Sequence, residues 1–276
     1  MKILLCTDGS AAAARAARFG LRLARRGVDA LQLLGVIEDH EDAARLIRDA
    51  LETLGAELQT IGVEYETKTR RGHAAEQILD EAEIWQADLI VIGQLGRRGL
   101  TRFIMGGTAT RVMQYARCAV LLVKGQRPAL RKILVCTAGG EPGLRDVEVA
   151  GQLAAQTQAT VTVLHVMSQV ALTEKAYLPE LEAPAADLIV RHTREGVHLE
   201  AALNTLKSMG VSCAAKVRHG LVVDEIAAET TDGNYDLLII GAHVARGLSR
   251  WLLDDVTAHV LEETPVPVLV VRDARK

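Results

Sequence analysis

A glycine- and arginine-rich segment, Gly93–Thr110, has residue types that are suited to holding an anion. It contains five glycines, three arginines and no acidic residue. Phosphate oxygens need several N–H donors that converge on one place, and glycines let the backbone approach closely and adopt positive φ. The residues from Gly106 onward indicate a helix start, whose free N–H groups and positive dipole end favour an anion. The segment predicts a phosphate site, with an ordinary surface turn as the alternative.

An aspartate is placed to take part in the same site. Asp8 follows an apolar run at Lys2–Thr7, and the glycine-rich segment follows a second run at Asp88–Gly93; both runs predict buried strands. In open parallel sheets, ligands lie outside the carboxyl ends of the strands, where the strand order reverses. A strand order of 3-2-1-4-5 would place the first and fourth strands together, so that Asp8 and the glycines meet in one crevice.

Other residues with reactive side chains form no familiar catalytic or metal-binding pattern. The P-loop pattern GxxxxGK[ST] is absent, the eight histidines include no HExxH, and the four cysteines form no CxxC pair. We interpret the cysteines as structural thiols. His73 and His219, each next to a glycine, are interpreted as equivalent residues of one turn that occurs twice.

The bulk composition bounds the class of protein. The chain has 276 residues, which suits two domains, with 49% hydrophobic and 24% charged residues. The formal net charge of −3 argues against a protein that binds nucleic acid or a membrane surface. No apolar run reaches the roughly 18 residues of a membrane-spanning helix. The first apolar run is too short for a secretory signal and ends at Asp8, so a cytoplasmic protein is expected.

An internal repeat organises the chain. Three blocks return in the same order: KILLCTDG as KILVCTAG, ADLIVIGQLGRRGLTR as YDLLIIGAHVARGLSR, and CAVLLVKG as VPVLVVRD. An ordered repeat of this kind indicates a duplicated domain. The short polar segment Lys124–Lys132 suits a linker, so we predict domains at residues 1–125 and 131–276. The offset between the copies rises from 130 to 148 residues, which predicts an insertion near Met167–Asp187 in the second copy.

Each copy predicts an α/β fold. Apolar runs of strand length alternate with segments whose apolar residues recur at helical spacing. The runs are rich in Ile, Leu and Val with little alternation, which is typical of parallel strands covered on both faces. In the first copy, strands are predicted near Lys2–Thr7, Ala30–Ile37, Val63–Thr69, Asp88–Gly93 and Ala119–Lys124. The fold class is therefore two tandem copies of an open, five-stranded parallel sheet.

These residues resemble the universal stress proteins, and the chain resembles a tandem two-domain member of that family. Nucleotide-binding members carry Gly-x2-Gly-x9-Gly-Ser/Thr after the fourth strand and an aspartate at the end of the first. Gly93, Gly96 and Gly106 match that spacing, and Asp8 matches the aspartate. The resemblance covers both halves and implies an adenine nucleotide α-hydrolase-like fold in each.

The resemblance also implies a ligand, ATP with Mg²⁺, in the first domain. The first-strand aspartate and a second-strand valine lie beside the adenosine, and the glycine loop surrounds ribose and phosphates. The matching cofactor-binding residues are Asp8, Val36, Gly93, Gly96, Arg97, Gly106, Gly107 and Thr108.

Gly107 departs from the family pattern, which has Ser or Thr there. The hydroxyl is lost or, if Gly107 and Thr108 form the pair, displaced by one residue. Losing one hydrogen bond to a charged phosphate weakens binding by about 1.5–3 kcal/mol, or roughly ten- to a hundredfold.

The second copy has lost the features suited to phosphate. Ala138 replaces the aspartate, Val244 the second glycine, and Asp254 and Asp255 the last two. A β-branched valine resists positive φ, and carboxylates repel phosphate while capping a helix themselves. The side-chain charge is +3 over residues 93–110 and zero over residues 241–257. We interpret the second domain as structural or regulatory, without bound nucleotide.

The resulting hypothesis is an ATP-binding module of stress response or signalling, with little or no hydrolysis because no positioned base is evident. The alternative is a scaffold or sensor of the same fold that acts through protein contacts or another small ligand. A third hypothesis, an ATP pyrophosphatase, needs an SGGxDS-type loop that CTDGSAAAA does not resemble.

The expected partners are an adenine nucleotide and an unidentified protein, without nucleic acid or membrane. The equivalent strands CAVLLVKG and VPVLVVRD are expected to pair within the chain as a pseudo-dimer, which would seal two sheet edges. The sequence leaves a further homodimer open.

Overall fold

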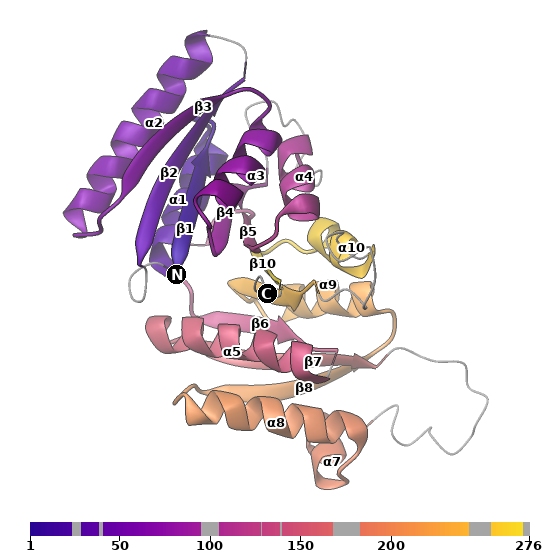
Figure 1. The fold of residues 1–276 in the computed structure, drawn as a ribbon. Coiled ribbons are helices and arrows are strands. Elements are labelled where there is room, and N and C mark those ends of the chain that lie inside the picture. Colours follow the sequence, from indigo (N-terminus) through magenta and orange to yellow (C-terminus); the bar gives the residue numbers. More distant parts are fainter. Residues whose placement is uncertain are drawn as a thin grey trace. The chain divides into compact units, whose positions relative to one another are not determined.

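A computed structural model describes residues 1–23, 29–38, 41–94, 105–127, 129–138, 140–167, 183–242 and 255–272. The chain forms two compact units, unit 1 built on residues 1–126 and unit 2 built on residues 127–242 and 255–271. In both units, strands and helices alternate along the chain (Figure 1).

Unit 1 is a doubly wound α/β unit. Its elements are β1 (Lys2–Thr7), α1 (Ala11–Leu23), β2 (Ala30–Ile37), α2 (Glu41–Thr60), β3 (Glu66–Arg71), α3 (Ala74–Ile84), β4 (Leu89–Gly93), α4 (Gly107–Tyr115) and β5 (Ala119–Val123). The strand order is β3-β2-β1-β4-β5, with every neighbouring pair parallel. This confirms the predicted order 3-2-1-4-5, with β1 and β4 adjacent.

The third strand differs from its predicted range of Val63–Thr69, because β3 begins at Glu66 and continues to Arg71. Gly62 adopts φ of 70°, and the N–H of Val63 donates to the carbonyl of Leu58 at 3.2 Å. The turn that ends α2 therefore engages Val63, and the chain joins β2 only after it.

Unit 2 repeats this architecture. Its elements are β6 (Lys132–Cys136), α5 (Gly140–Thr157), β7 (Thr160–Met167), α7 (Ala185–Val190), α8 (Arg194–Ser208), β8 (Cys213–His219), α9 (Val222–Asp232), β9 (Leu237–Gly241), α10 (Asp255–Glu263) and β10 (Val268–Val271). The order β8-β7-β6-β9-β10 is again parallel throughout. The predicted insertion falls largely on residues 168–182, outside the described residues, and α7 follows that stretch.

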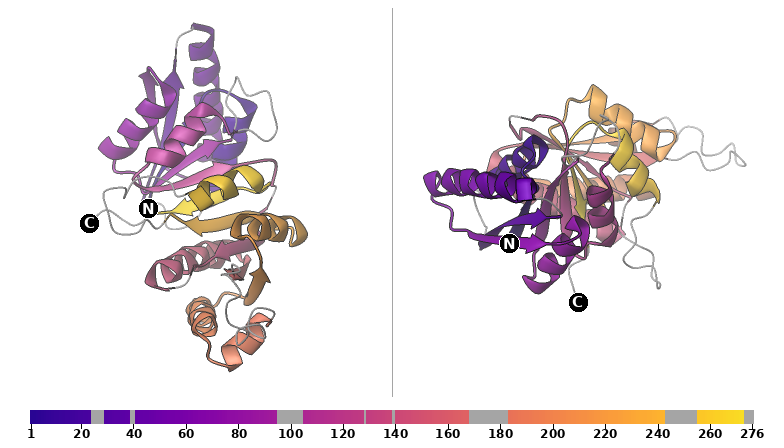
Figure 2. Two further views of the ribbon diagram at one scale, coloured as in Figure 1. Left: turned by 90° about the vertical axis from the view of Figure 1, so that its right-hand side faces the viewer. Right: turned by 90° about the horizontal axis from the view of Figure 1, so that it is seen from above.

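Helices cover both faces of each sheet (Figure 2). In unit 1, α1 packs against β1 and β4, while α3 packs against α4, β2 and β3. As a result, Ile3 and Leu4 of β1 are 0% exposed, as are Leu237 and Leu238 of β9. Strands that are apolar on both faces can be buried only in such a sandwich of helices, which explains their uninterrupted apolar runs.

Each unit buries one glutamate between a helix and its outer strand. In unit 1, Glu81 of α3 accepts hydrogen bonds from Lys68 Nζ at 2.9 Å and Arg70 Nε at 2.6 Å. The Glu81 side chain is 1% exposed. Arg70 also donates to Gln77 Oε1 at 3.3 Å. A carboxylate at this depth is tolerable only when it is paired and hydrogen-bonded, so these contacts join α3 firmly to β3.

Unit 2 contains the same cluster at Glu229. Its carboxylate accepts from Lys216 Nζ and Arg218 Nε, each at 2.6 Å, and from the Tyr235 hydroxyl at 2.8 Å. Burial alone would raise the pKa of Glu229, but the hydrogen bonds from Lys216, Arg218 and Tyr235 outweigh it, and the net pKa is lowered. Burial foremost, and then its contact with the carboxylate, raises the pKa of Tyr235 to about 12, so the phenol remains a donor.

Removing the charge at Glu229 should make unit 2 less stable at neutral pH and less sensitive to acid. Because the folded pKa lies below the unfolded one, the stabilisation is complete above about pH 4.3 and is lost as the pH falls through the folded pKa. Glu229→Gln should therefore cost about 1–3 kcal/mol at pH 7 and less than that at pH 3.5. Urea unfolding followed by circular dichroism at both pH values measures this difference.

Glu225→Gln is the matched control for this experiment. Glu225 contacts the same arginine, Arg218, but its side chain is 26% exposed, so the loss should stay below about 1 kcal/mol. An equal destabilisation by Glu229→Gln at both pH values would contradict the linkage of the buried carboxylate to acid stability.

Candidate functional site

The turn after β1 holds Asp8 at the carboxyl end of a central strand. Asp8 is half-buried, and its Oδ1 accepts the N–H of Ser10 at 2.9 Å. Ser10 Oγ in turn accepts the N–H of Ala13, which caps the first turn of α1. Gly9 adopts φ of 78°, and a Cβ there would lie 3.0 Å from the backbone of Leu46. The motif Asp-Gly-Ser thus builds a tight turn that only glycine fits, and it fixes the position of the carboxylate.

The carboxyl end of β4 lies beside this turn. The register of β1 and β4 pairs Leu5 with Val91, which places Thr7 level with Gly93. The structure therefore brings the strand ends that carry Asp8 and Gly93 together, as the predicted strand order requires. A Cβ at Gly93 would lie 3.1 Å from the backbone of Ala12, so this glycine also allows α1 to pass close to the strand.

The two ends of the glycine-rich segment are held together. The N–H of Gly106 donates to the carbonyl of Gln94 at 3.0 Å, and the N–H of Gln94 donates to Val123 of β5 at 3.1 Å. The segment therefore leaves and returns at one point of the sheet edge. Gly96 and Arg97 lie outside the described residues, as do Arg98 and Arg102.

Helix α4 starts at this same point, and no described side chain caps its first N–H groups. Gly106 is its N-cap residue and makes no side-chain cap, and the first turn contains no acidic residue. Gly107 is the first helical residue, followed by the half-buried Thr108. A Cβ at Gly107 would meet no atom of the described residues within 4 Å. The helix start therefore offers N–H donors, a positive dipole end and open space to an anion.

Val36 and Glu38 lie at the end of β2. Val36 is 5% exposed. Glu38 follows the strand, is half-buried, and accepts the N–H of Ala74 at 3.1 Å, which connects it to the start of α3. Its position directly after the second strand could have marked Glu38 as a ligand-binding residue in the sequence, since acidic side chains there contact the ribose in dinucleotide-binding doubly wound folds.

The corresponding edge of unit 2 carries different chemistry. Ala138 occupies the place of Asp8, and α10 begins with Asp255 in its first turn. His165 Nδ1 lies 2.9 Å from the carbonyl of Thr137, which makes that nitrogen a donor. Val244 and Asp254 lie outside the described residues. Among the described residues, this edge therefore has no counterpart of Asp8, and it carries Asp255 at the place of Gly107.

The proposed equivalence of two histidines is wrong. His219 is the last residue of β8 and precedes Gly220, whereas His73 follows Gly72 and is the N-cap residue of α3. The repeated lysine, arginine and glutamate of the two ion clusters set the alignment, which matches His219 with Arg71. A neighbouring glycine alone was too weak a guide to register.

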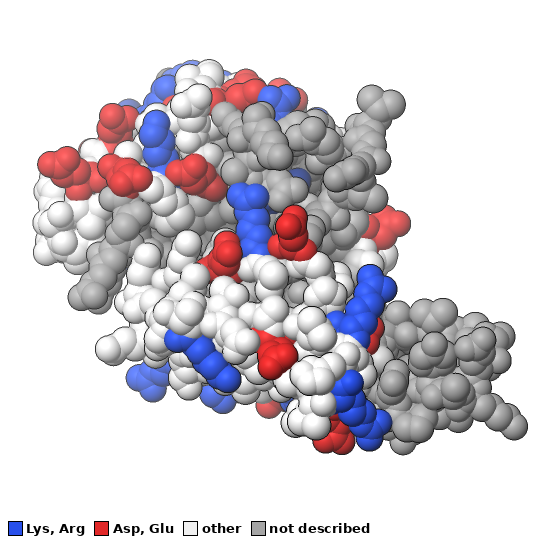
Figure 3. Space-filling model, turned by 60° about the horizontal axis from the view of Figure 1, so that its bottom comes forward, with Lys and Arg blue, Asp and Glu red and all other residues white. Residues whose placement is uncertain are grey.

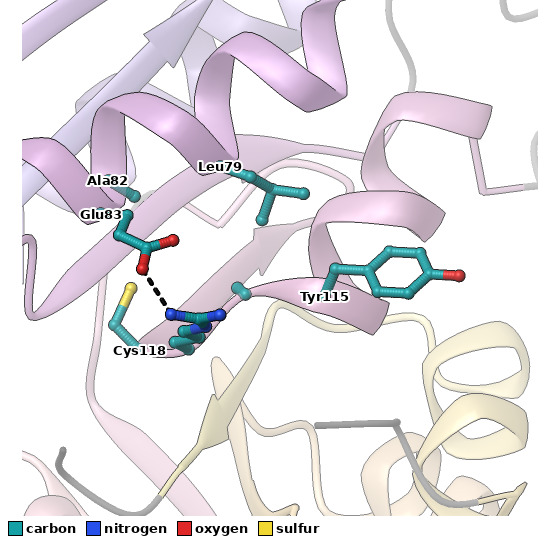
Figure 4. A pocket seen from close by; sticks show the side chains of 7 residues that line it. Leu79, Ala82, Glu83, Tyr115 and Cys118 are labelled. Carbon is teal, nitrogen blue, oxygen red and sulfur yellow. Dashed lines mark hydrogen bonds and ion pairs between the residues drawn. The ribbon is translucent and has the colours of Figure 1, made fainter. Parts of the chain in front are cut away.

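The described cysteines are free thiols. Burial raises the pKa of Cys6 and of Cys136 well above the ordinary value, which keeps both protonated and unreactive. Cys118 lines a small cavity of about 30 Å³, bordered by the ion pair of Glu83 with Arg117 and by the Tyr115 ring (Figure 4). This volume holds about one water molecule and is too small for a nucleotide.

Two further observations bear on partners. Among the described residues, no group of three or more His, Cys, Asp or Glu is arranged to hold a metal ion. None of the described helices is long and apolar enough to cross a membrane. On the face of the molecule in Figure 3, acidic and basic side chains are interspersed, without an extended basic patch among the described residues there.

Two tandem doubly wound α/β units, the first with an uncapped helix start beside Asp8, define a class of protein with the Rossmann-like sheet topology. The model of the universal stress protein family matches residues 1–124 and again residues 129–272. The chain therefore belongs to the universal stress protein family and carries its domain twice.

Individual relatives agree with this assignment. The chain is 32% identical over 138 residues to universal stress protein MJ0531 of Methanocaldococcus jannaschii, covering 45% of this chain and 81% of that protein. It is 30% identical over 99 residues to universal stress protein Sll1388 of Synechocystis, covering 36% and 64%. A solved universal stress protein of Archaeoglobus fulgidus has the same fold, with a TM-score of 0.69, 19% identity, and coverage of 99% of this chain and 96% of that one.

Proposed function

We propose that the first domain, residues 1–125, binds ATP, and that the chain is a nucleotide-dependent module of stress response or signalling. The observation that carries the proposal is the start of α4, where Gly106 leaves the helix without a side-chain cap and the first turn has no acid. The loop ends meet there through the bond from Gly106 to Gln94, next to the strand that ends in Asp8. Phosphates at that helix start would satisfy N–H groups that no described side chain caps.

The proposed site uses the residues matched to the family motif. Asp8 and Val36 would flank the adenosine, and Gly93, Gly96, Arg97, Gly106, Gly107 and Thr108 would surround ribose and phosphates. Mg²⁺ would be held by the phosphates themselves, since the described residues offer no metal-ligand cluster. Hydrolysis would be slow, because the sequence shows no motif for a positioned general base.

The second domain, residues 131–276, is proposed to bind no nucleotide. Asp255 stands in the first turn of α10, where its carboxylate would repel a phosphate, and Ala138 offers no carboxylate to a nucleoside. ATP in the first domain would then bias a conformation or a surface that a protein partner recognises.

The nucleotide content of the purified chain tests the proposal. The protein is denatured, and the released small molecules are separated by ion-pair chromatography and identified by mass. We expect one adenine nucleotide per chain. Two per chain would contradict the assignment of the second domain.

An empty chain leads to a second measurement, the shift of the melting temperature by Mg-ATP. A rise in the melting temperature would show a weak site that empties during purification. No shift at millimolar Mg-ATP would reject ATP binding and favour the scaffold or sensor, a function consistent with glycine at position 107 where the family has a hydroxyl.

A further inference from the structure

Along the carboxyl edge of the unit 1 sheet, one side carries carboxylates and the other carries backbone N–H donors. Carboxylates follow β1 and β2, at Asp8 and Glu38. On the other side of β1, past the end of β4, the first turn of α4 presents N–H groups without an acidic residue. A nucleotide on this edge would therefore place its phosphates toward α4 and its uncharged nucleoside toward Asp8 and Glu38.

One oxygen of the Glu38 carboxylate has no hydrogen-bond partner among the described residues. Its Oε1 accepts the N–H of Ala74 at 3.1 Å, and it makes no other hydrogen bond or ion pair with the residues that the structure describes. Across the sheet, Arg71 lies level with Ile37 and Arg70 lies level with Val36. Arg70 is engaged by Glu81 and Gln77, and neither arginine makes a hydrogen bond or ion pair with Glu38 in the described structure. The second oxygen of this half-buried carboxylate is thus available to a donor on a ligand.

Comparison of the two units shows that the fold does not need this carboxylate. Strand β7 matches β2 residue by residue, with Met167 at the place of Ile37, and the next residue in the sequence is Ser168. Helix α9 matches α3 and begins after Leu221, whose side chain makes no cap. Glu38 therefore accompanies Asp8 as a feature of unit 1, the unit that keeps the features suited to phosphate.

We propose that Glu38 is a specificity-determining residue that accepts a hydrogen bond from a ribose hydroxyl of the bound nucleotide. The inference rests on the proposed nucleotide function and adds a substrate class to it, ribonucleotides whose ribose carries no further phosphate. A carboxylate accepts a hydrogen bond from a hydroxyl group and repels a phosphate at the same position. Loss of the hydroxyl leaves a partly desolvated carboxylate without its donor, which lowers affinity about ten- to a hundredfold.

Titration calorimetry of the full chain tests this selection with four ligands: ATP, 2′-deoxy-ATP, 3′-deoxy-ATP and ITP. The wild type should bind ATP about ten- to a hundredfold more tightly than one of the two deoxy forms. Adenosine 2′,5′-bisphosphate and adenosine 3′,5′-bisphosphate, compared with ADP, should show that an added ribose phosphate is disfavoured.

Glu38→Gln separates selection from a structural role. The amide oxygen of Gln can still accept the N–H of Ala74, so the melting temperature should stay close to that of the wild type. The preference for ATP over the deoxy form and for ADP over the bisphosphates should fall at least about threefold, because a neutral acceptor is the weaker one. Glu52→Gln, an exposed carboxylate of α2, is the control and should leave every ratio unchanged.

The outcomes distinguish this inference from the proposed function. A wild type that binds ATP and both deoxy forms equally would overturn the role of Glu38 and leave ATP binding intact. If the wild type discriminated only against ITP, and Glu38→Gln lost this discrimination, the carboxylate would contact the base. That result would also overturn the ribose assignment. If none of the nucleotides bound, both proposals would be rejected.

Discussion

Gly96→Val should lower the affinity of the chain for Mg-ATP by at least about a hundredfold, since two or more backbone contacts to phosphate would be lost at about 1.5–3 kcal/mol each. The family motif places Gly96 within the loop that surrounds the phosphates. A β-branched side chain there disfavours positive φ and keeps the ligand from the backbone. The substitution copies the second unit, which has Val244 at the matching position. Isothermal titration calorimetry of the full chain measures the loss.

Val244→Gly is the matched control for this variant. It restores the glycine of unit 2 but leaves Ala138, Asp254 and Asp255 in place, so no second nucleotide should bind and the affinity of the first site should not change. Asp8→Ala should also abolish binding, because it removes the carboxylate that we propose lies beside the nucleoside. Wild-type affinity in Gly96→Val would show that the phosphate site lies elsewhere.

Gly107→Ser should raise the affinity for ATP by about ten- to a hundredfold, by restoring the hydroxyl that the family pattern has at this position. The structure favours this gain, because a Cβ at Gly107 would meet no atom of the described residues within 4 Å and the backbone there is helical. A serine in the first turn could therefore direct its hydroxyl to a phosphate without displacing a neighbour. The same calorimetry, with ATP and ADP as ligands, measures the gain.

Two further substitutions at position 107 isolate the hydroxyl and the charge. Gly107→Ala adds the Cβ without the hydroxyl and should leave the affinity within about threefold of the wild type, a difference of about 0.7 kcal/mol. Gly107→Asp copies Asp255 of unit 2 and should abolish binding through repulsion of the phosphates. Equal affinities of the Ser and Ala variants would show that no phosphate lies within reach of this residue.

The fold could be predicted closely because its signals are local. Ile, Leu and Val runs such as Lys2–Thr7 and Ala30–Ile37 coincide with β1 and β2, since strands buried on both faces leave an uninterrupted apolar pattern. The internal repeat showed in addition that the same succession of strands and helices occurs in both copies. The error at Val63 arose because a residue that completes the end of α2 is as apolar as one that begins a strand.

The candidate site was likewise predictable only in part from the sequence. Asp8 and the glycines could be selected from the sequence, because glycine spacing and an acid after a strand are local features. Their meeting depended on the strand order, which long-range pairing decides: Leu5 lies beside Val91 through the sheet, and no local pattern encodes that pairing.

By itself, the amino-acid sequence determined the duplication, the α/β class and the difference between the two copies at Asp8 and Ala138. Only the tertiary structure decided which charges meet. It brought Lys68 and Arg70 of one strand onto Glu81 of a helix, and Glu38 onto the first N–H of α3. The reason is physical: apolar periodicity records burial along one element, whereas a carboxylate is satisfied by partners that arrive from other elements once the sheet has formed.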